Sequence, residues 1–326
     1  MRIKSVLLLT SRLAILAAAM LAAIPAHAQQ YPEKPIRLLA PFPAGGLSDL
    51  LARALGTRLT ASMGQPVIIE NRPGGGTTIA SEIVAKAAPD GYTLFLQDIS
   101  AHAINATLFP KLPYDSVKDF TQIALVASSP LMLVVLAGFP ASNLRELIAL
   151  GKARPGELAY ASPGNGTLPH LVTEAFKKQA GVNFLHVPYK GGTAVALISG
   201  QVALTFSIMP PAVANLKAGK FVAMGVTSAK RSGVAPAVPT MAEAGLPNFE
   251  FVIHSGVLGP AGISRRVLDK LNSEIAKAVA SPEMQTTLVA IGAEPVSVTP
   301  EQFTSYLIAE IGKLGRVVKE TGAKVD

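Results

Sequence analysis

The chain has 326 residues, of which 49% are hydrophobic and only 15% are charged, and this composition excludes an intrinsically disordered protein. It contains no Cys, so disulfide scaffolds, thiolate metal clusters and cysteine nucleophiles are excluded. The formal net charge of +8 is not gathered into Lys/Arg runs with interleaved aromatic residues, so we expect no binding of nucleic acid.

Residues 1–28 have the pattern of an export signal. Three basic residues precede an unbroken apolar run at 13–24, and Ala26-His27-Ala28 supplies the small residues of a signal-peptidase site. The alternative is an uncleaved membrane anchor, but the run is short for a hydrocarbon layer of about 30 Å. We therefore expect cleavage after Ala28 and a mature protein in the periplasm.

The mature chain reads as alternating strands and helices. Short apolar runs bounded by Gly, Pro and Asp predict strands, and apolar residues at helical spacing predict helices. In chain order we expect strand 36–42, helix 47–63 closed by Gly64, strand 67–70, helix 78–87, strand 93–96, strand 131–136, helix 144–153, strand 158–161, helix 168–179, strand 184–187, helix 194–199, helix 266–280, strand 294–297 and helix 300–322. Helices between strands indicate βαβ crossovers and mostly parallel sheets, whose buried strands are continuously apolar.

Two α/β layouts fit this rhythm. A (β/α)₈ barrel suits the length, whereas a doubly wound fold requires the sheet to be split between two domains. No internal repeat of fixed period stands out, and the pieces after Gly259 look like units that return to an earlier sheet. The sequence therefore predicts two doubly wound α/β domains joined by crossing linkers.

Four loops that follow strands are rich in Gly and small polar residues. They cover residues 41–49, 98–102, 161–167 and 187–193. Ligands bind beyond the carboxyl ends of strands in open α/β sheets, and the unpaired N–H groups at a helix start favour an anion. The alternative is that each loop is only a tight turn, with Ser48, Asp49 and Thr167 as N-caps. Neither a P-loop nor a GxGxxG fingerprint is present, so we do not expect nucleotide binding.

The histidines of the mature chain are scattered, without metal-ligand spacing. We therefore expect no metal and no cofactor. His170, in the first turn after residues 164–167, could donate to a bound anion, cap its own helix or pack against the first domain. His186 lies in an apolar strand, where a hydrogen-bonded core residue is the simpler interpretation.

Catalysis has little support in the sequence. The GxSxG nucleophile elbow and the SxxK and SDN elements are absent. A set such as Ser100, His170 and Asp49 can be assembled, but nothing in its spacing supports it. We therefore expect a binding protein and not an enzyme.

A series of motifs in one order gives a more specific indication. The motifs are Pro41-Phe42-Pro43-Ala44-Gly45-Gly46 with Ser48-Asp49, Glu70-Asn71-Arg72-Pro73-Gly74, Ala88-Pro89-Asp90-Gly91-Tyr92, Leu112-Pro113-Tyr114-Asp115, Gly164-Asn165-Gly166-Thr167 with His170, His186-Val187-Pro188-Tyr189-Lys190-Gly191-Gly192 and Val238-Pro239-Thr240. With these motifs, the mature chain resembles the Bug family, the periplasmic substrate-binding proteins of tripartite tricarboxylate transporters.

The resemblance implies a Venus-flytrap protein that closes on a small carboxylate, either a di- or tricarboxylate or an aromatic acid. Domain 1 would comprise residues 29–128 and 254–326, domain 2 residues 129–253, and the ligand cleft would lie between them. Family members hold one carboxylate with backbone amides and ordered water. By position, the expected ligand-binding residues are Phe42, Pro43, Ala44, Gly45, Ser48, Ser100, His102, Ser162, Gly164, Asn165, Gly166, Thr167, His170, Tyr189 and Ser207.

The expected partners are that ligand and the integral membrane subunits of such a transporter, with the protein itself a monomer. Two other functions stay open. The protein could be a ligand sensor that presents its closed form to a receptor kinase, or a periplasmic hydrolase of small acids or esters.

Three departures from the family pattern concern the far end of the ligand. Ser207-Ile208-Met209-Pro210 replaces a motif with Asp-Asn before the proline, His254 stands where a Trp is usual, and Asn105-Ala106 replaces Asn-Pro. A less acidic pocket suits a second carboxylate or an aromatic acid better than an α-amino group.

Overall fold

The architecture is that of one mixed sheet with helices packed along it. The structure of the chain, a computed structural model, describes residues 31–189 and 192–324, and the predicted export signal at 1–28 lies outside the described residues. The strands run in the order β2-β1-β3-β9-β4-β7-β5-β6, and β8 and β10 also pair with β4. Their bounds are β1 Ile36–Ala40, β2 Val67–Asn71, β3 Thr93–Asp98, β4 Phe120–Leu136, β5 Ala159–Ser162, β6 Leu185–Pro188, β7 Leu204–Ile208, β8 Phe221–Val226, β9 Val252–Pro260 and β10 Glu294–Pro295.

The outer strands are parallel and the central ones antiparallel. β1 pairs in parallel with β2 and β3, and β5 pairs in parallel with β6 and β7. Between these groups, β9 is antiparallel to both β3 and β4. The expectation of mostly parallel pairing is therefore wrong for the centre, and the order, which ends at β2 and β6, describes an open sheet and not a barrel.

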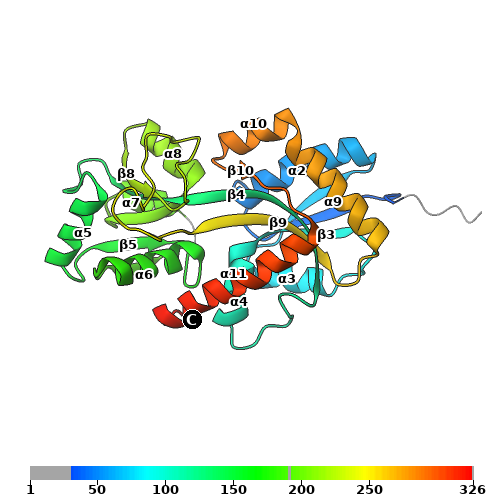
Figure 1. Cartoon of the computed structure of the whole chain (residues 1–326), viewed down its shortest axis with the longest axis horizontal. Helices are drawn as coiled ribbons and strands as arrows, with labels where there is room; N and C mark the ends of the chain where they lie inside the picture. Colours follow the sequence, from blue (N-terminus) through cyan, green and yellow to red (C-terminus); the bar gives the residue numbers. More distant parts are fainter. Residues whose placement is uncertain (1–30, 190–191, 325–326) are drawn as a thin grey trace, which may run out of the picture. The chain divides into compact units, whose positions relative to one another are not determined.

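β4 is shared by both ends of the sheet. Its 17 residues pair with β9 and β10 in the first part and with β7 and β8 in the second. The change falls between Pro130, opposite Val252, and Leu131, opposite Ile208. Figure 1 shows β4 and β9 running side by side through the middle of the fold. These two strands have the course expected of crossing linkers.

The helices cover the sheet with their apolar faces. In α9, Val267, Leu271 and Ile275 are buried at a spacing of four residues, the periodicity of one helical face. α2 packs on β1, β2 and α9, α6 on β5 and β7, and α11 on α4 and β4. The bounds are α2 Leu47–Met63, α3 Thr78–Ala85, α4 Ile99–Leu108, α5 Leu144–Ala153, α6 Leu168–Ala180, α7 Thr193–Ile198, α8 Met209–Lys217, α9 Arg265–Ala280, α10 Pro282–Ala290 and α11 Pro300–Thr321, with a 3₁₀ turn η1 at Gly75–Thr77.

The edge strands are less buried than their apolar sequences predict. β6 was expected to be a buried strand, but it closes one edge of the sheet, and Leu185 is 58% exposed. β2 closes the other edge, and Ile68 is 48% exposed. Strands with continuous apolar sequence are therefore fully covered only in the interior of this sheet, as in β3, where Leu94, Phe95 and Leu96 have no exposed surface.

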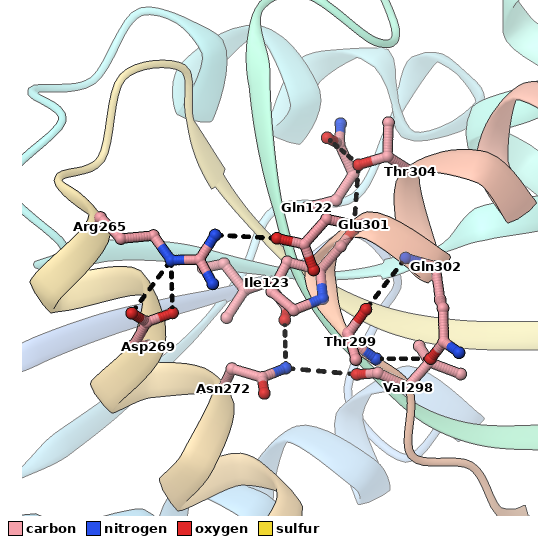
Figure 2. A network of polar contacts seen from close by, with 11 residues as sticks. Gln122, Ile123, Arg265, Asp269, Asn272, Val298, Thr299, Glu301, Gln302 and Thr304 are labelled. Atoms are coloured by element: carbon pink, nitrogen blue, oxygen red, sulfur yellow. Dashed lines mark hydrogen bonds and ion pairs between the residues drawn. The ribbon is translucent and has the colours of Figure 1, made fainter.

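A polar network attaches the returning C-terminal segment to β4. Figure 2 shows Asn272 of α9 donating to the backbone oxygens of Ile123 in β4 and Val298, at 2.7 and 3.3 Å. Thr299 and Gln302 form a reciprocal capping box at the start of α11. The end of the chain is therefore fixed to the same strand that both ends of the sheet share.

The described residues from Lys34 onward form one compact unit. The division into 29–128 with 254–326 and 129–253 stays a prediction; the change of partners in β4 at residues 130–131 lies beside its first boundary. Among the described residues, no helix has both the length and the apolar character needed to cross a bilayer.

Candidate functional site

The loop between β1 and α2 is shaped by Asp49. Its carboxylate accepts the backbone N–H of Gly45 at 2.9 Å and the Nδ2–H of Asn71 at 3.0 Å, and it pairs with Arg53 at 3.0 Å. The Arg53 hydrogen bond is the main cause that lowers the pKa of Asp49. Asp49 is therefore not the N-cap of α2: Gly46 is, and it offers no side-chain cap.

The loop predicted at 98–102 is instead the beginning of a helix. Asp98 is the N-cap of α4 and accepts the N–H groups of Ser100 and Ala101 at 2.9 and 3.1 Å. Burial raises the pKa of Asp98 to about 6. The Ser100 hydroxyl donates to the backbone oxygen of Val252 at 3.2 Å, so this predicted ligand residue joins α4 to β9.

His102 is a core residue of the same helix. It has no exposed surface, its Nε2 lies 2.8 Å from the Ser116 carbonyl oxygen, and its ring packs on Tyr114 and Phe120. Burial lowers the pKa of His102 to about 4. These contacts place His102 in the core, and its predicted contact with a ligand stays a prediction.

The turn between β5 and α6 is held by side chains on both sides. The Ser162 hydroxyl accepts the Gly164 N–H at 3.2 Å, and His170 Nδ1 accepts the Gly166 N–H at 3.1 Å. The Thr167 hydroxyl donates to the Gly164 oxygen at 2.8 Å, and Thr167, the N-cap, makes no side-chain cap. We expected N–H groups of this turn and of Gly45 to hold the ligand, but those of Gly45, Gly164 and Gly166 already have acceptors within the protein.

A stack of three rings lies behind this turn. His170 packs on His186 with centroids 4.2 Å apart, and His186 packs on Tyr160 at 4.7 Å, both nearly parallel. Ser162 Oγ lies 2.6 Å from His186 Nε2. Burial, and then the nearby His186, lower the pKa of His170 to about 4. His186 was expected in the core, but it is half-buried on the edge strand β6.

Two further predicted residues have partners of their own. The Tyr189 hydroxyl donates to Gln201 Oε1 at 3.0 Å, and the buried Ser207 donates to the Ile208 carbonyl oxygen at 3.1 Å. Gly166 lies against α4. A Cβ atom added at this position would clash with the side chain of Leu108. That Pro43 and Ala44 face the turn at 164–167 across a cleft stays a prediction.

The hydrolase alternative gains nothing from the geometry. Ser100 is bonded to Val252, the Asp49 carboxylate is taken by Gly45, Asn71 and Arg53, and His170 is bonded to Gly166. Each member of that set therefore has a separate structural role. The described part of the chain also holds no group of three or more His, Asp or Glu residues that could bind a metal ion.

Comparison with known proteins identifies the family. The model of the tripartite tricarboxylate transporter family receptor, TctC, matches residues 51–323. The chain belongs to this family. The protein BugT of Bordetella pertussis is 40% identical over 306 residues, which cover 93% of this chain and 94% of BugT. The resemblance to the Bug family is therefore confirmed.

Solved structures extend the family similarity to the fold. The Rpa4515 protein of R. palustris, solved with adipate, is 35% identical with a TM-score of 0.85, and the match covers 90% of this chain and 99% of that one. MatC from Rhodopseudomonas palustris, solved with bound malate, is 32% identical with a TM-score of 0.80, over 88% of this chain and 100% of that one. The predicted fold class, α/β of the periplasmic-binding-protein type, is confirmed.

Proposed function

We propose that this TctC-family protein captures a small carboxylate in the periplasm and delivers it to the membrane subunits of a tripartite tricarboxylate transporter. The observation that carries the proposal is that two relatives more than 30% identical over nearly the whole chain were solved with adipate and with malate. Both ligands are small dicarboxylates. The class of ligand expected from the departures at Ser207 and His254 agrees with them.

The β1–α2 loop and the β5–α6 turn support an anion site, because the helices that follow them start without a side-chain cap. Asp98 caps α4 with its own carboxylate, whereas neither α2 nor α6 has a side-chain cap. Uncapped amides at a helix start attract negative charge, helped by the helix dipole. We therefore assign the binding of the carboxylate to backbone amides in the first turns of α2 and α6. The amides of Gly45, Gly164 and Gly166 already donate within the protein.

Capture would proceed by a shift between open and closed forms. A ligand that gains contacts only in the closed form favours that form by the difference in its affinity for the two. The closed surface is then what a membrane subunit would recognise.

The proposal is tested by a thermal-shift screen with mono-, di- and tricarboxylates, aromatic acids and acidic amino acids, followed by calorimetry. At a concentration one hundred times its dissociation constant, a true ligand adds about 2.7 kcal/mol to the free energy of unfolding. We expect one equivalent of a dicarboxylate or an aromatic acid to bind and to be recovered unchanged. The matched control is adipamide, which keeps the chain of adipate but carries no charge.

Two outcomes would contradict the proposal. Equal stabilisation by adipate and adipamide would remove the carboxylate from recognition. Conversion of the bound acid or of its ester, seen by NMR, would make the protein a hydrolase. Delivery is tested separately, by uptake in cells that lack the protein but keep the membrane subunits.

A further inference from the structure

We propose that His170 is a positioning residue for the ligand site: as a neutral ring stacked on His186, it fixes the turn 164–167 in its binding shape. This inference rests on the proposed function, because it concerns the turn that leads into α6, whose first amides would hold the carboxylate. It assigns His170 a role different from that of a direct ligand donor.

The hydrogen bond fixes the proton on the ring. A backbone N–H can only donate, so Nδ1 of His170 must be the acceptor of the Gly166 N–H at 3.1 Å. Nδ1 therefore carries no proton, and the neutral ring carries its proton on Nε2. Protonation of Nδ1 would turn two donors toward each other and break the contact.

The turn needs such a support because its own backbone is permissive. Gly164 has a φ of 143° and Gly166 a φ of 74°, conformations that glycine enters and leaves at little cost. The contacts that define the turn come from Ser162, Thr167 and His170. Since Ser162 holds Gly164 and His170 holds Gly166, the two side chains fix the peptide groups on either side of Asn165.

The surroundings of the ring keep it uncharged. His170 is 7% exposed and its centroid lies 4.2 Å from that of His186. The groups that act on its charge are His186 from β6 and Glu174 and Lys177 from α6, and Tyr160 of β5 lies beyond His186. Two imidazolium rings at this separation would repel strongly in a buried site, so the stack disfavours charge on both rings at once.

The alternative role uses the other nitrogen. The described residues offer the Nε2–H of His170 no hydrogen-bond partner, so this group could donate to the carboxylate directly. The two roles make opposite demands on a replacement. An asparagine amide reaches the position of Nδ1, and a glutamine amide reaches that of Nε2.

The test compares His170→Asn and His170→Gln in the full mature chain, with adipate and malate as probes in calorimetry near neutral pH. We expect His170→Asn to bind within about threefold of the unaltered protein and His170→Gln to bind about tenfold more weakly, because a buried N–H is then left unpaired. Lys178→Gln is the matched control. It lies on the same helix in an exposed pair with Glu320, and we expect unchanged affinity.

The pH dependence of ligand affinity gives a second readout. A purely structural role of His170 would leave this dependence the same in the unaltered protein and in His170→Asn. Between about pH 7.5 and pH 4, the affinity of the unaltered protein relative to His170→Asn should fall about twofold or more, since half of the His170 rings are charged at a pH equal to their pKa. Ionisation of the probe cancels in this ratio, because both proteins meet the same acid.

The outcomes separate this inference from the proposed function. Tight binding by His170→Gln together with weak binding by His170→Asn would make His170 a ligand donor and overturn the inference. Equal affinities of the two variants would overturn it as well. If the unaltered protein binds neither probe, the proposed function fails for these acids, and the inference is decided by ¹⁵N NMR. It is supported by an unprotonated Nδ1 at neutral pH and overturned by a protonated one.

Discussion

Gly166 combines two constraints at a single position. Its φ of 74° lies in the left-handed region, and the space where a side chain would start is occupied by Leu108 of α4. The resemblance to the Bug family placed Gly166 among the expected ligand-binding residues. In the structure, Gly166 first lets the turn approach another helix.

Replacement by alanine separates these constraints. Gly166→Ala has to hold a left-handed backbone, which costs about 1–2 kcal/mol, and also has to displace Leu108. Gly64→Ala is the matched control, because Gly64 has a φ of 71° and no atom within 4 Å of the added carbon. We expect the larger loss of unfolding free energy for Gly166→Ala, measured with urea without ligand. Equal losses would mean that Leu108 moves aside freely.

The residues predicted the two turns of the candidate site, but not the hydrogen bonds within them. Small residues after strands indicated the turns at 41–49 and 161–167, which both open long helices. Which amides stay available depends on Asn71 and His186, which come from neighbouring strands. Their contributions require the pairing of β2 with β1 and of β6 with β5, which no local pattern specifies.

At the scale of elements, some helices were predicted closely, whereas the start of β4, the helix α4 and the strands β7, β8 and β9 were missed. α2 and α5 have the predicted bounds, because their apolar faces and end signals agree. The first part of β4 was missed, since Thr121, Gln122 and Pro130 interrupt its apolar run. α4 was taken for a loop because its first turn lacks apolar spacing; the cap by Asp98 explains why it forms nevertheless.

The capping box at the start of α11 allows a test at this scale. Thr299→Ala removes the acceptor of the Gln302 N–H at 3.2 Å, and we expect a loss of about 1 kcal/mol in the free energy of unfolding. Ser305→Ala on the same helix serves as control, because its exposed hydroxyl bonds only the Glu301 carbonyl oxygen. A loss for Thr299→Ala no larger than that of the control would show that α11 is held by packing alone.

For the whole molecule, the buried His102 and His170 and the half-buried His254 predict sensitivity to acid. Burial lowers the pKa of His102, His170 and His254 to about 4, from 6.5 in an unfolded chain. The unfolded state therefore binds more protons between these values, and stability falls as the pH drops from about 6.5 to 4, by on the order of 3 kcal/mol per histidine.

Buried acids act in the opposite direction. Burial raises the pKa of Asp98 to about 6 and also raises that of Glu310, so these groups favour the folded state as they take up protons. With three histidines against two acids, we expect a net decrease in the urea midpoint from about pH 7 to pH 4.5. A urea midpoint that stays constant or rises as the pH falls over this interval would contradict the expectation that the histidines outweigh the buried acids.

The course of β4 limits how parts of this protein can be exchanged. Chimaeras between relatives are normally joined in loops, where a mismatch of sequence is harmless. Here the change of partners at Pro130 and Leu131 lies inside a hydrogen-bonded strand. A segment transplanted from a relative and joined at this point would therefore have to pair in the strand register of the host. Ligand preference in this architecture is therefore more easily altered by substitutions in the turns than by recombining halves.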